Sequence, residues 1–192
     1  MGGDEVDPVL ELFGRRGTVI LTEPRRPILR PWHGPRMHLL AADGTVLAHL
    51  HEPVGFGYVL RDLADRPVLA VDLVSGKGLA RPRFQVSDPG GAPIGEVRSP
   101  HRSSHTRLLE IRTEDGTGTL RVTRNAFMGR TWSVRDRHDG ETGRLTVSTA
   151  RAFDGLQQYR VELDRHANRE QRLLVVATAV CLQVIRRWLV GP

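Results

Sequence analysis

REQRLLVVATAVCLQVIRRWLVGP, residues 169–192, places leucine, valine, alanine and isoleucine on every side of a helical wheel. Asn168 stands directly before this segment, in the position of a helix N-cap. A helix that is apolar all round has to be buried. The pattern therefore predicts a buried helix over about residues 169–189.

The apolar part of this helix, Leu173 to Ile185, is bounded by Arg172 and by the pair Arg186 and Arg187. A stretch of this length is too short to span a bilayer comfortably and is typical of a core helix. We therefore expect no transmembrane span. A membrane-anchored tail on an open β-domain is the competing arrangement.

A repeated unit precedes the helix. Its copies read YVLRDLADRPVLAVDL from Tyr58, FQVSDPGGAPIGEV from Phe84, LEIRTEDGTGTLRV from Leu109 and WSVRDRHDGETGRLTV from Trp132. Within a copy the apolar side chains alternate, as at Trp132 and Val134, and alternation places them on one face of a strand. Each copy is therefore predicted to be a β-hairpin.

Turn-forming residues separate the paired runs. They are Asp43-Gly44, Asp65-Arg66-Pro67, Asp88-Pro89-Gly90-Gly91, Asp115-Gly116 and Asp139-Gly140. About five or six hairpins supply ten to twelve antiparallel strands, which have to close or pair their edges. The predicted fold is mainly β: a barrel of about twelve antiparallel strands closed round the buried helix.

The chain is expected to form a single domain. Residues 37–192 contain the repeats and the helix, whereas residues 1–36 read as a partly irregular N-terminal segment. Within that segment Thr18–Thr22 is predicted to be a first strand, and four prolines break the pattern after it.

The formal net charge of +6 comes from the second half of the chain. Lys77 is the only lysine, and this preference for arginine is typical of a GC-rich genome such as a bacterial one. The single cysteine, Cys181, lies in the apolar run and favours a structural thiol in a reducing compartment. The first residues lack the apolar region of a secretory signal. We expect a cytoplasmic protein.

Basic residues provide the candidate ligand-binding surface. Strand alternation predicts that Arg107, Arg121, Arg124 and Arg130 gather on outer faces, where anionic headgroups or phosphates would fit. The full candidate set is Lys77, Arg81, Arg83, Arg98, Arg102, Arg107, Arg121, Arg124 and Arg130. The alternative is an ordinary solvated barrel exterior.

The sequence resembles the tubby-like barrel superfamily, in the branch of phospholipid scramblases and LURP-one-related proteins. The likeness covers about residues 37–190 and rests on the aromatic-x-Val-x-Asp strands, the step Ile94-Gly95-Glu96-Val97, and the ending in which YRVELD leads into LLVVATAVCLQVI. It implies a twelve-stranded barrel round a central helix and, by analogy, phosphoinositide contact through basic residues of the exterior. Scramblases carry an acidic stretch, proposed to bind calcium, before their last helix. The corresponding residues 152–164 of this chain contain few acidic side chains, so neither calcium binding nor lipid flipping is expected.

Other groups of residues give weaker indications of function. His49 and His51 share one strand face, a spacing that cupin-type metal sites use, but a surface pair is the simpler interpretation. The segment from His101 to His105 reads as a solvated loop rather than a nucleophile with its base. No phosphate-binding glycine loop is present, and few aromatic residues are available to stack on bases, so we expect no specific nucleic-acid binding.

These observations predict a non-enzymatic binding domain without cofactor or metal, cytoplasmic or peripheral at the membrane. The expected partner is anionic phospholipid or a membrane surface. One alternative is a protein-interaction or structural barrel with no lipid ligand. The other is a cupin-like metalloenzyme that uses His49 and His51.

Overall fold

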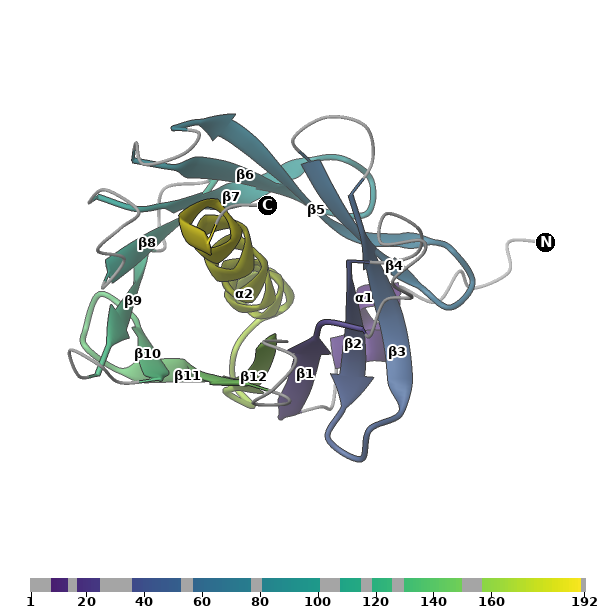
Figure 1. Cartoon of the computed structure of the whole chain (residues 1–192). Helices are drawn as coiled ribbons and strands as arrows, with labels where there is room; N and C mark the ends of the chain where they lie inside the picture. The colour runs from purple at the N-terminus through teal and green to yellow at the C-terminus, as the bar shows by residue number, and fades with distance from the viewer. Residues whose placement is uncertain are drawn as a thin grey trace.

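The structure, a computed structural model, describes residues 8–13, 17–24, 36–52, 57–76, 81–100, 108–114, 119–125, 130–149 and 157–190. These residues form one closed antiparallel barrel with a C-terminal helix inside it (Figure 1). The predicted fold class is thereby confirmed.

Twelve strands make the wall within the described residues. They are β1 (Thr18–Thr22), β2 (Met37–Ala41), β3 (Val46–His51), β4 (Gly57–Asp62), β5 (Pro67–Ser75), β6 (Arg83–Ser87), β7 (Pro93–Arg98), β8 (Leu108–Thr113), β9 (Thr119–Arg124), β10 (Thr131–Arg135), β11 (Glu141–Thr149) and β12 (Gln157–Leu163). Each strand pairs with its neighbours in the sequence, and β1 pairs with β12 to close the barrel. The twelve described strands therefore leave no free sheet edge among them for another chain to pair with.

The alternating apolar residues point into the barrel, as the repeats predict. Phe84, Val86 and Val134 are fully buried, while the residues between them are more exposed. Asp65 and Asp139 adopt positive φ angles of 62° and 66° in the turns after β4 and β10. Short polar residues tolerate this left-handed conformation, which explains why the turn signals were readable in the sequence.

Helix α2 (Arg169–Val190) fills the barrel. Every side chain from Leu173 to Ile185 is at most 7% exposed. At its start the Gln171 N–H donates to Asn168 Oδ1 over 2.8 Å, and the Asn168 N–H donates to Gln171 Oε1 over 3.0 Å, which confirms the predicted N-cap. Neither helix of the described residues has the length and hydropathy that crossing a bilayer would need.

Two glycines stand where the barrel leaves no room for a side chain. A Cβ at Gly95 would clash with the carbonyl oxygen of Arg112 and lie 3.0 Å from Leu174 Cδ2. A Cβ at Gly143 would lie 2.9 Å from the carbonyl oxygen of Glu162 on the neighbouring strand, and in ordinary contact, 3.5 Å, with Val175 Cγ1. Gly95 therefore permits close packing of the helix against β7, and Gly143 permits the close pairing of β11 with β12.

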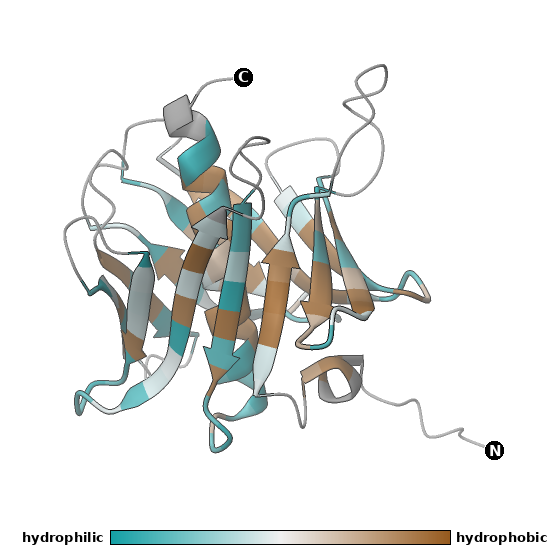
Figure 2. Cartoon of the chain, turned by 60° about the horizontal axis from the view of Figure 1, so that its bottom comes forward, coloured by the Kyte–Doolittle hydropathy of each residue, from teal (hydrophilic) through white to brown (hydrophobic). Residues whose placement is uncertain are grey.

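The N-terminal segment contributes more than sequence analysis predicts. β1 lies between β12 and β2 as a full member of the barrel. A short helix that was not predicted, α1 (Pro8–Phe13), lies beneath the end of the barrel where α2 begins (Figure 2). Its Val9, Leu12 and Phe13 are buried in the common core.

Candidate functional site

The two ends of the barrel differ in charge. Because neighbouring strands are antiparallel, all odd-numbered strands finish at the end where α2 also finishes, which we call the upper rim. The charged side chains that the structure describes there are Arg36, Arg81, Arg83, Arg98, Arg124, Arg130, Arg186 and Arg187, together with Glu23, Glu52, Asp72 and Glu110. Arginines thus outnumber carboxylates at this end.

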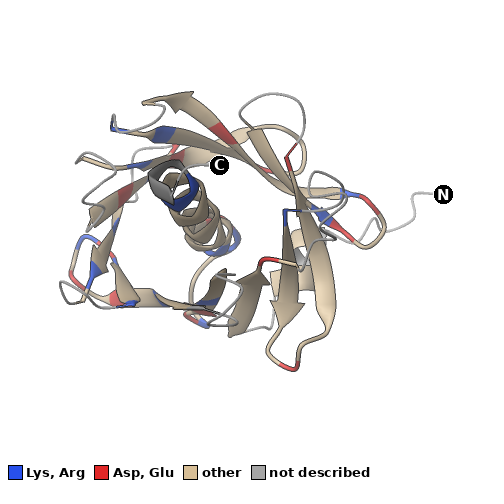
Figure 3. Ribbon diagram, in the orientation of Figure 1, with Lys and Arg blue, Asp and Glu red and all other residues tan. Residues whose placement is uncertain are grey.

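The opposite end, the lower rim, contains the short turns between paired strands, and these turns are rich in acidic residues. Its described acidic side chains include Asp43, Asp62, Asp65, Asp88, Glu114, Asp136, Asp139 and Asp164. Arginines such as Arg66 and Arg137 lie among them, so this end is mixed in sign. Figure 3 shows the contrast between a red segment in the β2–β3 turn and the blue end of α2.

Acids on the outer face of the wall pair with two of the upper-rim arginines. Arg83 Nη2 lies 2.5 Å from Glu96 Oε2, and Arg98 forms an ion pair with Glu110. Arg112 Nη2 is 4.0 Å from the same Glu110 oxygen. Cross-strand pairing places Glu110 between Arg98 and Arg121. The wall is therefore a ladder of alternating charges rather than a uniformly basic face.

Arg124 does not lie on the outer face that strand alternation was expected to give it. It shares the inward face of β9 with Leu120 and Val122, because it stands at an even number of residues from both. Its guanidinium carbon lies 5.1 Å from the ring centroid of Trp132, its cross-strand partner. The prediction for Arg124 is thus corrected: it stacks on an inward-facing indole at the mouth of the barrel.

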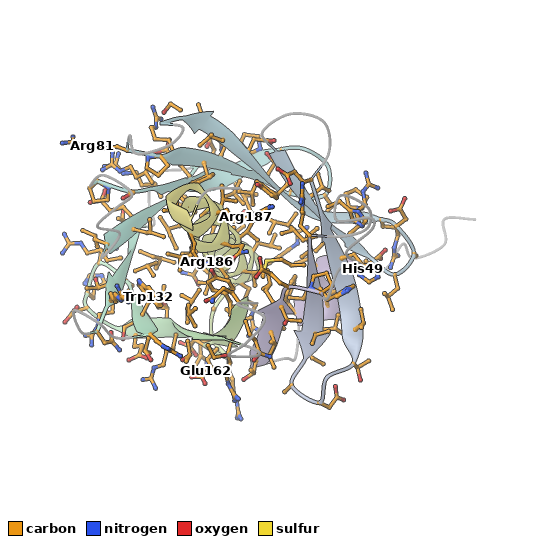
Figure 4. The ribbon with its side chains drawn as sticks, in the orientation of Figure 1. His49, Arg81, Trp132, Glu162, Arg186 and Arg187 are labelled. Atoms are coloured by element: carbon orange, nitrogen blue, oxygen red, sulfur yellow. The ribbon has the colours of Figure 1, made fainter. Side chains whose placement is uncertain are left out.

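The remaining candidates divide into two groups. Arg81, Arg121 and Arg130 are exposed, and none forms an ion pair with an acid of the described residues. In Figure 4 the side chain of Arg81 points away from the barrel axis. Lys77, Arg102 and Arg107 lie outside the described residues.

A polar cluster ties the last turns of α2 to the wall. Glu23 accepts hydrogen bonds from Gln183 and, at 3.2 Å, from Arg186 Nη2. The buried Tyr159 hydroxyl donates to Gln183 Oε1 over 2.8 Å. Burial raises the pKa of Tyr159, so it stays a neutral donor. Arg186, which lies between α2 and the wall in Figure 4, is therefore largely committed to holding the helix.

A second cluster stands nearby on the upper rim. Glu52 pairs with Arg36, and Arg187 Nη1 lies 3.6 Å from the same carboxylate oxygen. Tyr58 donates to Glu52 Oε1 over 3.3 Å, and burial together with this carboxylate raises the pKa of Tyr58 to about 12. One carboxylate thus faces two guanidinium groups, which leaves a net positive charge here.

Three histidines gather on the outer face of β2 and β3. His38 and His49 are cross-strand partners, and their Nδ1 atoms lie 2.8 Å apart. The ring of His51 stands 6.3 Å from that of His49, centroid to centroid. Burial and the neighbouring His49 lower the pKa values of His38 and His51. Among the described residues, no group of three His, Cys, Asp or Glu side chains is arranged to hold a metal ion.

The chain is thus a closed antiparallel barrel built round a central helix, with a cationic upper rim. No family model matches its sequence, and no curated protein does. The X-ray structure of a protein from Arabidopsis thaliana superposes with a TM-score of 0.61 at 16% identity, over 97% of this chain and 100% of that one. At this identity the likeness establishes a shared fold.

Sequence analysis missed several of these groups. His38 had a readable signal, since it and His49 stand at equal distances from the Asp43-Gly44 turn. Glu23 and Glu52 had none, because their partners come from a helix far away in the sequence. The inward position of Arg124 was readable, since it stands two residues after Val122 on the same strand, whereas its contact with Trp132 depends on the pairing of β9 with β10, whose connection carries no tight-turn signal.

Proposed function

We propose that this chain is a non-enzymatic binding domain whose upper rim contacts an anionic surface, with phospholipid headgroups as the ligand class. The observation that carries the proposal is the excess of arginine over carboxylate at the upper rim. Arg81 and Arg130, exposed and without an acidic partner in the described residues, are the groups best placed to meet phosphate. The resemblance to tubby-like and scramblase domains supports the same ligand class.

The expected strength of this contact is modest. A basic residue near an anionic membrane contributes about 1 kcal/mol, so two or three arginines without an acidic partner among the described residues give about 2–3 kcal/mol. Arg83 and Arg98 can add to this, because exposed ion pairs are worth about 0–1 kcal/mol and exchange partners readily. We therefore expect a cytoplasmic protein that associates reversibly with the membrane surface and is not anchored in it.

Protein docking has less support in the described residues. Their large exposed apolar side chains are Leu63, 64% exposed, and Val74, 57% exposed. Leu63 lies in a turn of the lower rim and Val74 near the upper end of β5, so they make no common patch. The metalloenzyme alternative has two outward histidines but no third ligand in those residues.

Vesicle flotation with the full chain tests the proposal. Neutral vesicles are compared with vesicles rich in phosphatidylserine, at about 0.1 M and about 1 M salt, where the Debye length falls from about 10 Å to about 3 Å. We expect binding to the anionic vesicles alone, and its loss at high salt. Equal binding to neutral vesicles, or none to anionic ones, would overturn the proposal.

Matched variants locate the contact. Arg81→Gln with Arg130→Gln removes two charges from the upper rim, and Arg137→Gln with Arg165→Gln removes two exposed charges from the lower rim. We expect the first pair to weaken binding about 30-fold, corresponding to about 2 kcal/mol, and the second to change it little. Equal losses would show that net charge alone drives binding, with no oriented rim.

A further inference from the structure

The histidine pair on the outer wall has an arrangement that the phospholipid proposal does not use. His38 and His49 lie side by side on paired strands, with Nδ1 atoms 2.8 Å apart and ring planes inclined by 71°. Both rings are partly buried, and Figure 4 shows His49 on the β2–β3 side of the barrel, away from α2. Two neighbouring strands therefore hold two imidazole nitrogens against each other.

Two facing Nδ1 atoms can share only one proton between them. One ring donates an N–H, and the other must present its lone pair. Within the described residues no carboxylate is a hydrogen-bond partner of either ring. The accepting ring therefore already presents the nitrogen lone pair that a metal ion would bind.

The separation also matches a metal chelate. Nitrogen ligands bind ions such as Zn²⁺ at about 2.0–2.1 Å, so two nitrogens at a right angle on one ion are about 2.8–3.0 Å apart, and two at the tetrahedral angle that Zn²⁺ prefers are about 3.3–3.4 Å apart. Right-angled nitrogen pairs are typical of tetragonal Cu²⁺ and Ni²⁺. A tetragonal ion in place of the shared proton would therefore find the two nitrogens at about the separation that they already have.

We infer that His38 and His49 form a two-imidazole site for a divalent transition-metal ion of the Cu²⁺, Ni²⁺ and Zn²⁺ class. Water or an external ligand completes the coordination, because the described residues offer no third ligand in place. Arg61 faces His49 across β3 and β4, but it is engaged with Asp65, whose carboxylate lies 3.6 Å from it. This neighbouring cation limits affinity to that of an open surface site.

The pairing of strands, not the spacing along one strand, defines the site. A chelate of His49 with His51 would use two residues of β3, whereas our site uses one residue from each of β2 and β3. The two arrangements make opposite predictions for His38 and His51. His138, exposed in a turn of the lower rim, lies away from this site and serves as the control residue.

Calorimetric titration of the full chain with CuCl₂, NiCl₂ or ZnCl₂ tests the inference. We expect one ion per chain, with affinity highest for Cu²⁺. His38→Ala and His49→Ala should each lower affinity at least about tenfold, the loss that even an outer-shell partner causes, while His51→Ala and His138→Ala change it little. An equal loss in His51→Ala, or affinity unchanged in His38→Ala, would overturn the site.

A second measurement needs no variant. NMR spectra of the native chain, titrated with ZnCl₂, should show the ring signals of His38 and His49 shifting together at one equivalent, while that of His138 stays in place. Shifts spread evenly over all histidines, or absent from His38, would refute the inference. This readout holds even where a His38 variant fails to fold.

Discussion

The two ends of the barrel use arginine in different ways. At the lower rim Arg172 is 7% exposed and donates to the carbonyl oxygens of Phe13, Asp164, Arg165 and Ala167 at 2.8–3.0 Å. At the upper rim Arg81 and Arg130 are exposed and form no ion pair within the described residues. The same side chain closes the structure at one end and is available to a ligand at the other.

This difference follows from what each end connects. The lower rim joins the first residues of α2 to the turn after β12 and to α1, so its backbone carbonyls need donors. The upper rim receives the last turns of α2, where Arg186 and Arg187 complement the negative end of the helix dipole. Stability therefore depends most on the lower rim, and the proposed binding on the upper.

The largest effect is expected from Arg172. Arg172→Met keeps the bulk of the side chain but removes its donors from four backbone carbonyl oxygens, of which the bond to Phe13 is buried and the others are partly buried. Since hydrogen bonds to charged groups are worth about 1.5–3 kcal/mol each, we expect a loss of about 3 kcal/mol in the free energy of unfolding. Urea denaturation measures it.

The control for this variant is Arg165→Met, which removes one charge from an exposed side chain of the same turn. It should change the free energy of unfolding by less than about 0.5 kcal/mol. Similar losses in both variants would mean that net charge, and not the bonds to the carbonyls, stabilises the lower rim.

An intermediate effect is expected from Asp62, 7% exposed at the end of β4. Its carboxylate accepts from the N–H groups of Ala64 and Arg66 at 2.9 and 2.8 Å, and from Arg66 Nε at 2.6 Å. Asp62→Asn keeps an acceptor but loses the charge, so we expect about 1 kcal/mol of destabilisation at neutral pH.

This loss should depend on pH with a definite sign. Burial alone would raise the pKa of Asp62, but the hydrogen bonds and charge of Arg66 outweigh it and hold this pKa below its ordinary value. The stabilisation is therefore present above the unfolded pKa of about 3.9 and disappears as the pH falls through the lower folded value. The free energies of unfolding of the native and variant chains should approach each other as the pH falls below about 4. A difference that stays constant with pH would show that the charge of Asp62 is not what stabilises the fold.

The sequence predicted the fold better than the site. Alternation at pairs such as Trp132 and Val134, and an apolar segment from Leu173 to Ile185, are local signals that determine strand faces and a buried helix. Ion pairs and the contact of Arg124 with Trp132 depend on register between strands, which bulges such as that at Leu39/Leu40 shift. The number of charged residues along the chain does not show which arginines form ion pairs with acidic side chains.

Substitutions of upper-rim arginines should have the smallest effect on stability. They also test most directly whether the two rims differ in role. Arg81→Gln with Arg130→Gln removes no ion pair formed with the described residues, so the free energy of unfolding should change by less than about 0.5 kcal/mol while vesicle binding falls. Urea denaturation and flotation on the same preparations measure both quantities. A variant that binds vesicles normally but unfolds more easily would reverse the roles of the two ends, because these arginines would then belong to the closure of the barrel rather than to its ligand.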